Sequence, residues 1–430
     1  MSAVEAETYD PLIPVPAARR VFGLTDAFSL WFSLGIGLLV LQTGALLTPG
    51  LSLPVALAAI VAGSLAGVAL LGAAAMAGAD TGLSAMAGLR PALGVRGAAL
   101  PAGLNVLQLV GWGAFELVAM RDAADALCKQ TFNVSSPMAW TLIFGGLATL
   151  MAMLGPVSFV RRFLRRWGLL LLLGGAGWLT WQLLATQNLG ALWARPGDGT
   201  GSFGAALDLV IAMPLSWLPL VADYSRFGAN PRDMFRGSAG GYLLANIWFY
   251  ALGAAYALIA PGDHLLVTAL AAAGGGIALI LVVIDESDNA FADIFSAAMS
   301  LGVVVKAKVT RLALFFGVLC TAIALMIPVA AFESFLYLIG SVFAPLFGVL
   351  LADHFVLRRR GIDASAISAK GGAYWFTAGF SWAGLLAWIA GIGAYQLVTA
   401  TNPSMGATLP GFVIGAGSYL ILSVGRWLKV

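Results

Sequence analysis

The stretch WFSLGIGLLVLQTG, residues 31–44, decides the fold because it is an apolar segment with two glycines near its middle. Gly35 and Gly37 weaken a helix at this point, since glycine loses more conformational freedom in a helix than other residues do. Extended to residues 26–48, the segment is long enough to cross the hydrocarbon of a bilayer, which takes about 20 apolar residues. It therefore predicts a membrane-spanning helix that is interrupted halfway across.

A second segment, LVIAMPLSWLPLVADYSRF at residues 209–227, has Pro214 and Pro219 on either side of Ser216 and Trp217. Proline removes a backbone donor and clashes with the preceding turn, so we expect this helix to open as well. Transporters built from inverted repeats bind substrate at mid-membrane, between helices that are interrupted at matching positions. The alternative is that glycine and proline are simply common in membrane helices. The matched positions favour a transporter.

The composition of the chain predicts an all-α polytopic membrane protein. Of its 430 residues, 60% are hydrophobic and 10% are charged, whereas a soluble protein has about 25% charged residues. So few charges cannot build a water-facing surface, and the lipid bilayer must cover most of it. We expect twelve membrane-spanning helices, at residues 26–48, 52–78, 97–124, 137–154, 165–187, 205–224, 237–260, 274–302, 309–330, 333–355, 372–398 and 407–427.

Lysine and arginine set the expected orientation, because cytoplasmic loops carry an excess of both. With the N-terminus inside, all 23 basic residues except Arg121, Lys129 and Arg195 fall on the inner side of this series. We therefore expect a multi-pass protein of the inner (cytoplasmic) membrane with both termini cytoplasmic. The slight basic excess follows from this topology and does not indicate nucleic acid. Nothing in the sequence predicts an obligate protein partner.

The order of the segments predicts the domain organisation. Residues 1–25 form a cytoplasmic N-terminal segment, and residues 356–430 form two additional helices and a cytoplasmic C-terminus. Between them, residues 26–355 form a ten-helix transport core of two five-helix repeats, about 26–187 and about 205–355. The second repeat begins on the opposite side of the membrane from the first, so the two repeats are expected to be inverted.

The third helix of each repeat has polar residues in the middle of its apolar sequence. In LNVLQLVGWGAFELVAM, residues 104–120, Gln108, Trp112 and Glu116 are four apart and share one helix face. In residues 276–302, five polar side chains fall within an arc of about 160° at 100° per residue. They are Asp285, Glu286, Asp288, Asn289 and Asp293. Ionisable groups at this depth are costly unless they face a cavity or a partner, which makes each a functional candidate. The alternative is a polar cluster that only holds helices together.

The charge of this region is unbalanced in the sequence. The four helices concerned carry no lysine or arginine at this depth. Carboxylates without a protein counter-charge must be partly protonated, or must hold a cation or a cationic substrate. The residues alone leave these alternatives open.

Five stretches together resemble the nucleobase–cation symporter-1 family. They are FSLWFSLGIGLLVLQTGALLTPGLSLP (28–54), LRPALGVRG (89–97), LNVLQLVGWGAFEL (104–117), MPLSWLPLVADYSRF (213–227) and VFAPLFGVLLADHFVLRRRG (342–361). The chain is most similar to the cytosine permease-like members, within the hydroxymethylpyrimidine transporter branch. This resemblance implies the leucine-transporter-like 5+5 inverted repeat plus two C-terminal helices. It also implies uptake of a small aromatic heterocycle coupled to sodium or protons, with no cofactor.

The resemblance also implies where the substrate binds. The family's glutamine and tryptophan of the third helix match Gln108 and Trp112, where the ring stacks on the substrate and the glutamine bonds to its edge. In the sixth helix the match gives Ser216 as a substrate contact, with Pro214 and Trp217 beside it.

The coupling-ion site is likewise implied by the resemblance. The hydroxyl pair that coordinates sodium in relatives matches Asp288 and Asn289, and a substrate-binding polar position matches Asp285. This site would face the interruption of the first helix at Ser33, Gly35 and Gly37. A carboxylate and an amide replace the family's serine and threonine, so the coupling ion is either sodium, held at Asp288 and Asn289, or a proton. The absence of a basic partner favours the proton.

The chemistry of these side chains suits an aminopyrimidine. Trp112 and Trp217 offer flat faces for stacking. Gln108 and Glu116 can accept a hydrogen bond from the exocyclic amine, and a protonated Glu116 can donate to a ring nitrogen. This chemistry agrees with the substrate class that the resemblance implies, so we expect an importer of a small aromatic heterocycle; the resemblance implies hydroxymethylpyrimidine, a thiamine precursor, or a cytosine-like pyrimidine.

Three other functions were weighed against this interpretation. An amine or amino-acid cation symporter of the same fold is the main alternative, because several carboxylates suit a cation. An enzyme is disfavoured because the only histidines, His264 and His354, lie near predicted membrane edges and cannot supply a metal site. A channel is disfavoured because paired interrupted helices are typical of alternating access.

Overall fold

The interruption of the first helix is present in the computed structural model, which describes residues 10–158, 169–259, 276–327 and 332–424. Helix α2 (Leu24–Leu34) and helix α3 (Leu38–Ala45) meet at an angle of 56°. A Cβ atom at Gly35 would lie 2.8 Å from the Cβ of Ala245, on helix α13 (Pro231–Ile259). Lack of space therefore requires a glycine at this position, and the interruption expected at Gly35 and Gly37 is confirmed.

The sixth predicted helix is interrupted more mildly than its two prolines suggest. Helix α11 (Phe203–Ser216) and helix α12 (Leu218–Ser225) are separated by Trp217 alone, whose φ of −84° and ψ of −15° are helical. Together they form one continuous membrane span, Phe203–Ser225. Pro219 lies in the first turn of α12, where a missing backbone donor costs little. For this reason the expected wide opening does not occur.

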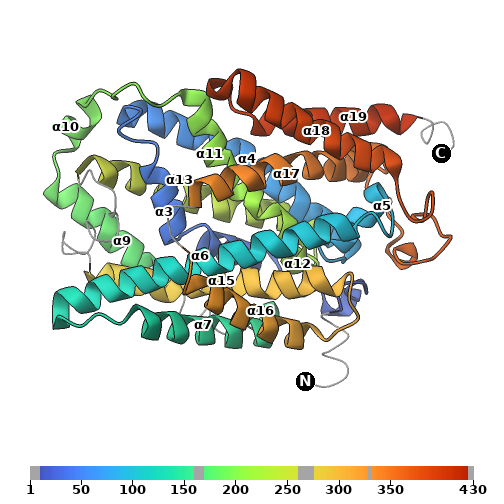
Figure 1. Ribbon diagram of the computed structural model, residues 1–430, viewed down its shortest axis with the longest axis horizontal. Helices are drawn as coiled ribbons and strands as arrows, with labels where there is room; N and C mark the ends of the chain where they lie inside the picture. The colour runs from blue at the N-terminus through green and yellow to red at the C-terminus, as the bar shows by residue number, and fades with distance from the viewer. Residues whose placement is uncertain (1–9, 159–168, 260–275, 328–331, 425–430) are drawn as a thin grey trace.

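The helices form a layered bundle (Figure 1). On one side α6 packs on α15, and α7 packs on α16. In the middle, α13 contacts α2, α3 and α4, while α4 also contacts α11 and α12. The bounds of these helices are α4 (Leu53–Thr81), α6 (Ala99–Phe132), α7 (Pro137–Leu154), α15 (Gly276–Gly302) and α16 (Val309–Ala324).

The C-terminal helices cover the opposite side of the bundle (Figure 1). Helix α17 (Phe332–Leu351) continues as a π-helical turn, η6 (Ala352–Leu357), and contacts α18 (Trp382–Thr401) and α19 (Thr408–Leu422). Asp208 of α11 accepts hydrogen bonds from the backbone N–H groups of Ala407 and Thr408, at 2.7 and 2.9 Å. The first turn of α19 is thereby bonded to the transport core. Shorter helices complete the chain: α5 (Arg90–Leu93), α8 (Pro156–Ser158), α9 (Leu169–Thr186) and α10 (Leu189–Ala194).

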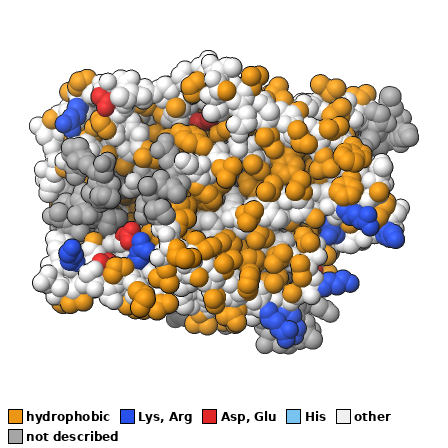
Figure 2. Space-filling view, in the orientation of Figure 1, with side chains coloured by type: hydrophobic (Ala, Val, Ile, Leu, Met, Phe, Trp, Pro, Cys, Tyr) orange, Lys and Arg blue, Asp and Glu red, His pale blue; other side chains and the backbone are white. Residues whose placement is uncertain are grey.

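The expected class, an all-α polytopic membrane protein, is confirmed. Among the described residues seven helices are long and apolar enough to cross a membrane, and the bent pair α2–α3 is an eighth. Figure 2 shows hydrophobic side chains over the middle of one face and lysine and arginine side chains towards its ends. Leu107 and Ile421, for example, are 69% and 72% exposed. Such a surface requires lipid around it.

Each expected span coincides with a helix or with an interrupted helix, but the span expected at 372–398 was placed wrongly at its start. The helix begins at Trp382, and the residues before it form turns. Phe376 and Ala378 have positive φ angles of 47° and 54°, which a helix excludes. The backbone of this loop instead bonds to residues 93–97, as in the 2.8 Å bond from the Ser381 N–H to the Leu93 carbonyl. A tertiary contact therefore determines its conformation.

Residues 10–22, which we call the N-terminal strap, close one end of the bundle. The Arg226 side chain is fully buried and donates hydrogen bonds to the carbonyls of Asp10 and Ile13. Arg20, at the other end of the strap, donates to the Ala79 carbonyl at 2.8 Å. The N–H of Phe22 bonds to the Phe227 carbonyl at 2.8 Å. Both ends of the strap are therefore fixed to α4 and α12.

Candidate functional site

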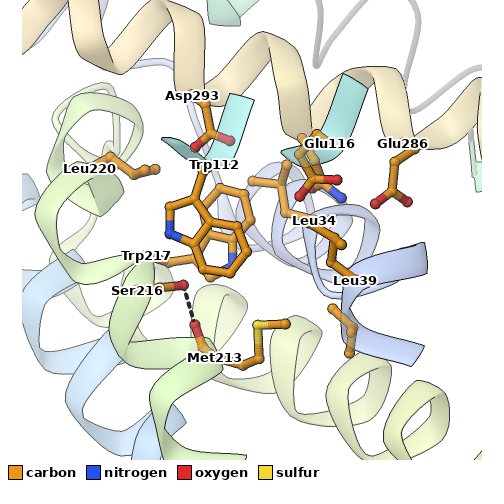
Figure 3. A pocket seen from close by; sticks show the side chains of 12 residues that line it. Leu34, Leu39, Trp112, Glu116, Met213, Ser216, Trp217, Leu220, Glu286 and Asp293 are labelled. Atoms are coloured by element: carbon orange, nitrogen blue, oxygen red, sulfur yellow. Dashed lines mark hydrogen bonds between the residues drawn. The ribbon is translucent and has the colours of Figure 1, made fainter. Parts of the chain in front are cut away.

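A small internal cavity lies where the two interrupted helices meet α6 and α15 (Figure 3). Side chains nearly fill it in this conformation, and the space left for water is about 10 Å³. Five of its twelve lining residues are non-aromatic apolar residues, two are tryptophans and five are polar, and none of the described lining residues is basic. The lining consists of Leu34, Leu39, Val40, Trp112, Glu116, Met213, Ser216, Trp217, Leu220, Glu286, Asn289 and Asp293.

Helix α6 places Trp112 and Glu116 in the cavity wall, one turn apart as their spacing predicts. The Trp112 ring meets Phe335 of α17 edge-on, with 5.5 Å between ring centroids. Gln108, another turn earlier, is buried but is not part of the lining. Its Nε2 donates to Asn105 Oδ1 at 2.8 Å, while its Oε1 has no partner among the described residues. Gln108, Trp112 and Glu116 share one face of α6 as expected, but only Trp112 and Glu116 reach the cavity.

The junction of α11 and α12 contributes Ser216 and Trp217. The indole Nε1 of Trp217 donates to the Tyr242 hydroxyl at 2.9 Å, which satisfies its polar group and leaves its ring as a wall. The Ser216 hydroxyl donates to the Met213 carbonyl at 2.7 Å (Figure 3). Pro214 is not part of the lining, because it packs against Gly67 of α4, where an added Cβ would lie 2.2 Å from its Cγ.

Helix α15 contributes Glu286, Asn289 and Asp293 to the lining. The carboxyl of Glu286 lies beside the carboxyl of Glu116 in this wall (Figure 3). Figure 3 shows both carboxyl groups at one end of the cavity, with Asp293 nearer to Trp112 at the other end.

Asp288 lies beside the interruption of the first helix rather than in the cavity. Its Oδ2 accepts a hydrogen bond of 2.6 Å from the Ser33 hydroxyl of α2. The structure therefore brings together the two helices that the sequence pairs at Ser33–Gly37. The side chain of Asp285 lies outside the described part of the structure.

The side-chain oxygens of the expected sodium ligands show whether these residues could hold a cation. Asp288 Oδ1 and Asn289 Oδ1 are both buried and have no partner among the described residues. Uncommitted carboxylate and amide oxygens are the ligand type that hard cations prefer, so these two residues fit such an ion. No group of three or more His, Cys, Asp or Glu side chains in the described regions is placed to hold a metal.

Two polar and five apolar lining residues were not assigned to the expected site. The polar ones, Glu286 and Asp293, lie at the edges of the polar arc of α15, and the arc was the signal that could have included them. The apolar ones gave no such signal, because nothing in the sequence separates them from other apolar residues of a membrane helix; they are Leu34, Leu39, Val40, Met213 and Leu220.

Comparison with known proteins places this architecture among permeases. Residues 14–422 match the family model described as permease for cytosine/purines, uracil, thiamine, allantoin. The hydantoin permease of Microbacterium maritypicum is 24% identical over 404 residues, covering 86% of this chain and 81% of that protein. The allantoin permease of Bacillus subtilis is 23% identical over 421 residues, covering 87% and 83%.

A solved structure shows the same fold. It is Mhp1, a nucleobase–cation-symport-1 family transporter, in a closed conformation with bromovinylhydantoin bound. The TM-score is 0.84 at 19% identity, over 97% of this chain and 95% of that chain. The match of the family model over almost the whole chain shows what kind of protein this is. The chain is a membrane permease, not an enzyme, and it belongs to the nucleobase–cation symporter-1 family.

Proposed function

We propose that the protein imports a small aromatic heterocycle by secondary active transport, and that this substrate is hydroxymethylpyrimidine or a cytosine-like pyrimidine. The observation that carries the proposal is the cavity at the interrupted helices, with Trp112 and Trp217 in its wall beside the carboxyls of Glu116 and Asp293. Two indole rings suit a flat substrate, and carboxyl groups suit an edge that carries N–H donors.

The polar lining favours an aminopyrimidine over the compounds named for the two relatives. Hydantoin and allantoin present alternating N–H and C=O groups, which an amide side chain matches with one donor and one acceptor. An aminopyrimidine presents an amine next to a basic ring nitrogen, so a carboxyl group can accept from the amine and share its proton with the ring nitrogen, a basic site that hydantoin and allantoin lack. The cavity has three carboxyl side chains and one amide, so its chemistry fits the aminopyrimidine better.

Within this proposal each predicted residue has a role. Trp112 and Trp217 stack on the ring, Glu116 bonds to its edge, and Ser216 contributes from the sixth helix. Gln108 acts beside the cavity, Asp285 contributes to substrate binding from α15, and Pro214 shapes α11.

The coupling ion in this proposal is a proton at Asp288, with sodium as the second candidate. Asp288 accepts a hydrogen bond from Ser33, and Asn289 lies beside Gly37 at the interruption. Gly35 instead packs against Ala245 and Tyr242 of α13. A proton on Asp288 would remove a buried charge that lacks a basic partner among the described residues. Sodium would instead be held by the uncommitted oxygens of Asp288 and Asn289. Binding of the ion next to α2 would favour the closed arrangement of the helices.

Alternating access would follow from the layers of the bundle. Helices α2–α4 and α11–α13 form one group and would rock against α6, α7, α15 and α16, which form the other. The protein would lie in the inner membrane, with both termini on the cytoplasmic side where most of its lysine and arginine lie. The ten-helix core at 26–355 would contain the moving parts, and the helices after residue 355 would brace it.

A second candidate function is the symport of an amine or a cationic amino acid. The absence of basic residues from the described lining favours it, since Glu116, Glu286 and Asp293 could together balance a cation. It differs from the first proposal in needing no flat ring in the substrate.

Uptake into proteoliposomes separates these candidates. Radiolabelled hydroxymethylpyrimidine, cytosine, hydantoin, allantoin and an aliphatic amine are offered under an inward proton gradient, an inward sodium gradient, both or neither. We expect uptake of the aminopyrimidines and its stimulation by the proton gradient. Uptake of the aliphatic amine alone would support the second candidate, and uptake of hydantoin or allantoin alone would reject the aminopyrimidine assignment.

A further inference from the structure

Glu286 reaches from α15 into the gap between α2 and α3. Its side chain is fully buried, and its Oε2 accepts a 2.8 Å hydrogen bond from the backbone N–H of Leu38. Leu38 begins α3, and the first N–H groups of a helix have no partner within it. The carboxyl of Glu286 therefore caps α3 from a different helix.

Gly37 makes this contact possible. A Cβ atom at Gly37 would lie 2.9 Å from each carboxyl oxygen of Glu286 and 3.0 Å from Nδ2 of Asn289. The φ of Gly37 is 178°, an extended conformation that any residue adopts. Glycine is therefore required here by space, because the carboxyl occupies the place of a side chain.

The same carboxyl lies beside Glu116 of α6 at one end of the cavity (Figure 3). Glu286 thus joins the first turn of α3 to α15. On the other side of the interruption, the hydrogen bond of Ser33 to Asp288 joins α2 to α15. Each half of the interrupted helix has its own carboxylate anchor on α15.

We propose that Glu286 is a positioning residue that holds α3, the outer half of the first helix, in its closed position and so keeps the cavity shut towards the outside. The proposal rests on the proposed function for the orientation of the chain and the direction of opening. Without the carboxyl, the first turn of α3 loses its cap and its hydrogen bond to α15. The cavity then opens outward more often. Val40 of α3 lines the cavity and reports this change.

The experiment measures access to the cavity and does not depend on knowing the substrate. Val40→Cys is introduced into a chain in which Cys128 and Cys320 are replaced by Ser and Ala. A membrane-impermeant methanethiosulfonate reagent is then added to right-side-out vesicles, and the labelling rate is measured. We expect Glu286→Ala to raise the rate about tenfold, the effect of one lost hydrogen bond to a charged group.

Glu286→Gln is the conservative variant. Its amide oxygen can accept from the Leu38 N–H and its amide nitrogen can donate to Glu116, so we expect labelling within about threefold of the parent, well short of the effect of a lost bond. The matched control is Ser287→Ala on the next position of α15, where the hydroxyl faces Met120 rather than the gap. It should leave the labelling rate unchanged.

Two outcomes would overturn the inference. The first is an unchanged labelling rate in Glu286→Ala, and the second is failure of Glu286→Gln to keep the labelling slow. If Glu286→Ala does not yield folded protein by size-exclusion chromatography, Gly37→Ala tests the same contact from α3, and an unchanged rate there would reject the proposal. An absence of heterocycle uptake by the unmodified protein would count against the proposed function and would leave the labelling result standing.

Discussion

Trp112 and Trp217 come from different helices and from different repeats, yet both enter one cavity wall. Their surroundings differ: the Trp217 indole is fixed by the Tyr242 hydroxyl, whereas Trp112 lies edge-on to Phe335 of α17. A ring that is fixed by a neighbouring side chain is already ordered before a ligand binds, which lowers the conformational entropy lost on binding. At the residue scale, the site is therefore a rigid aromatic frame with carboxyl groups at each end.

The first residue-scale prediction concerns stacking. Trp112→Ala removes a wall of the cavity and should weaken substrate binding by at least about tenfold, since an aromatic contact with its buried area is worth more than about 1.4 kcal/mol. Binding of the transported pyrimidine is measured by calorimetry in detergent. Trp181→Ala is the control, because that ring is 63% exposed on the outer surface and should have no effect. Unchanged affinity in folded Trp112→Ala protein would reject the stacking role.

The second residue-scale prediction concerns Glu116. Glu116→Gln keeps a donor and an acceptor at the position but can no longer gain or lose a proton. We expect the relative affinities for different aminopyrimidines to change, and the dependence of affinity on pH to weaken. The measurement is competition binding at several pH values. If the order of affinities and the pH profile both stay as in the parent, Glu116 has only a structural role.

At the element scale, the interrupted helices differ in kind. The first helix is bent by 56° at an interruption where neighbouring side chains leave no room for a Cβ atom. The sixth keeps its direction because only Trp217 separates α11 from α12. A bend requires bonds from elsewhere for the freed backbone groups, and Glu286 supplies them. This requirement for backbone hydrogen-bond partners explains one of the carboxylates of α15, that of Glu286.

The element-scale prediction concerns the N-terminal strap. Arg226 is fully buried and holds the carbonyls of Asp10 and Ile13. Arg226→Met keeps much of the side-chain volume but cannot donate these bonds, so the strap should detach more often. We expect proteolytic cleavage within residues 10–22 to be several-fold faster than in the parent, consistent with the loss of about 1–3 kcal/mol. Arg232→Met, a change at the exposed start of α13, is the control. Equal cleavage rates would show that Arg226 does not hold the strap.

At the scale of the whole molecule, the bundle has an apolar exterior and a charged, closed interior. Hydrophobic side chains cover the middle of the visible face (Figure 2), while Glu116, Glu286, Asp288 and Asp293 are all at most 4% exposed. Buried charges of one sign cost free energy unless they hold a proton or a cation. If the transporter is to complete its transport cycle, the proton or cation that balances these charges must bind and dissociate together with the substrate.

The whole-molecule prediction follows from that balance. Asp288→Asn removes one charge next to α2 while keeping an acceptor for the Ser33 hydroxyl. We expect the variant to lose accumulation driven by a proton gradient but to retain exchange of labelled for unlabelled substrate. Both are measured in proteoliposomes. Strict sodium dependence of the parent, with no response to a pH gradient, would assign the ion to sodium. Unimpaired accumulation by Asp288→Asn would remove Asp288 from coupling.

Much of the fold was determined by the sequence alone. Apolar runs of about 20 residues can only be buried in lipid as helices, because every backbone group must be bonded within the membrane. The interruption at Gly35 and Gly37 could also be predicted from the sequence, because two glycines weaken the middle of an otherwise apolar helix. The spacing of Trp112 and Glu116 fixed their common face, and both line the cavity.

Only the tertiary structure decided what surrounds these residues. Helical periodicity states which way a side chain points on its own helix, but not which helix lies opposite. The sequence therefore could not show that Glu286 bonds to the backbone of Leu38, or that Pro214 faces Gly67 rather than the cavity. It also misplaced the start of α18, because the turns before Trp382 are held by bonds to residues 93–97. Each of these depends on contacts between segments far apart in the chain, which local pattern does not encode.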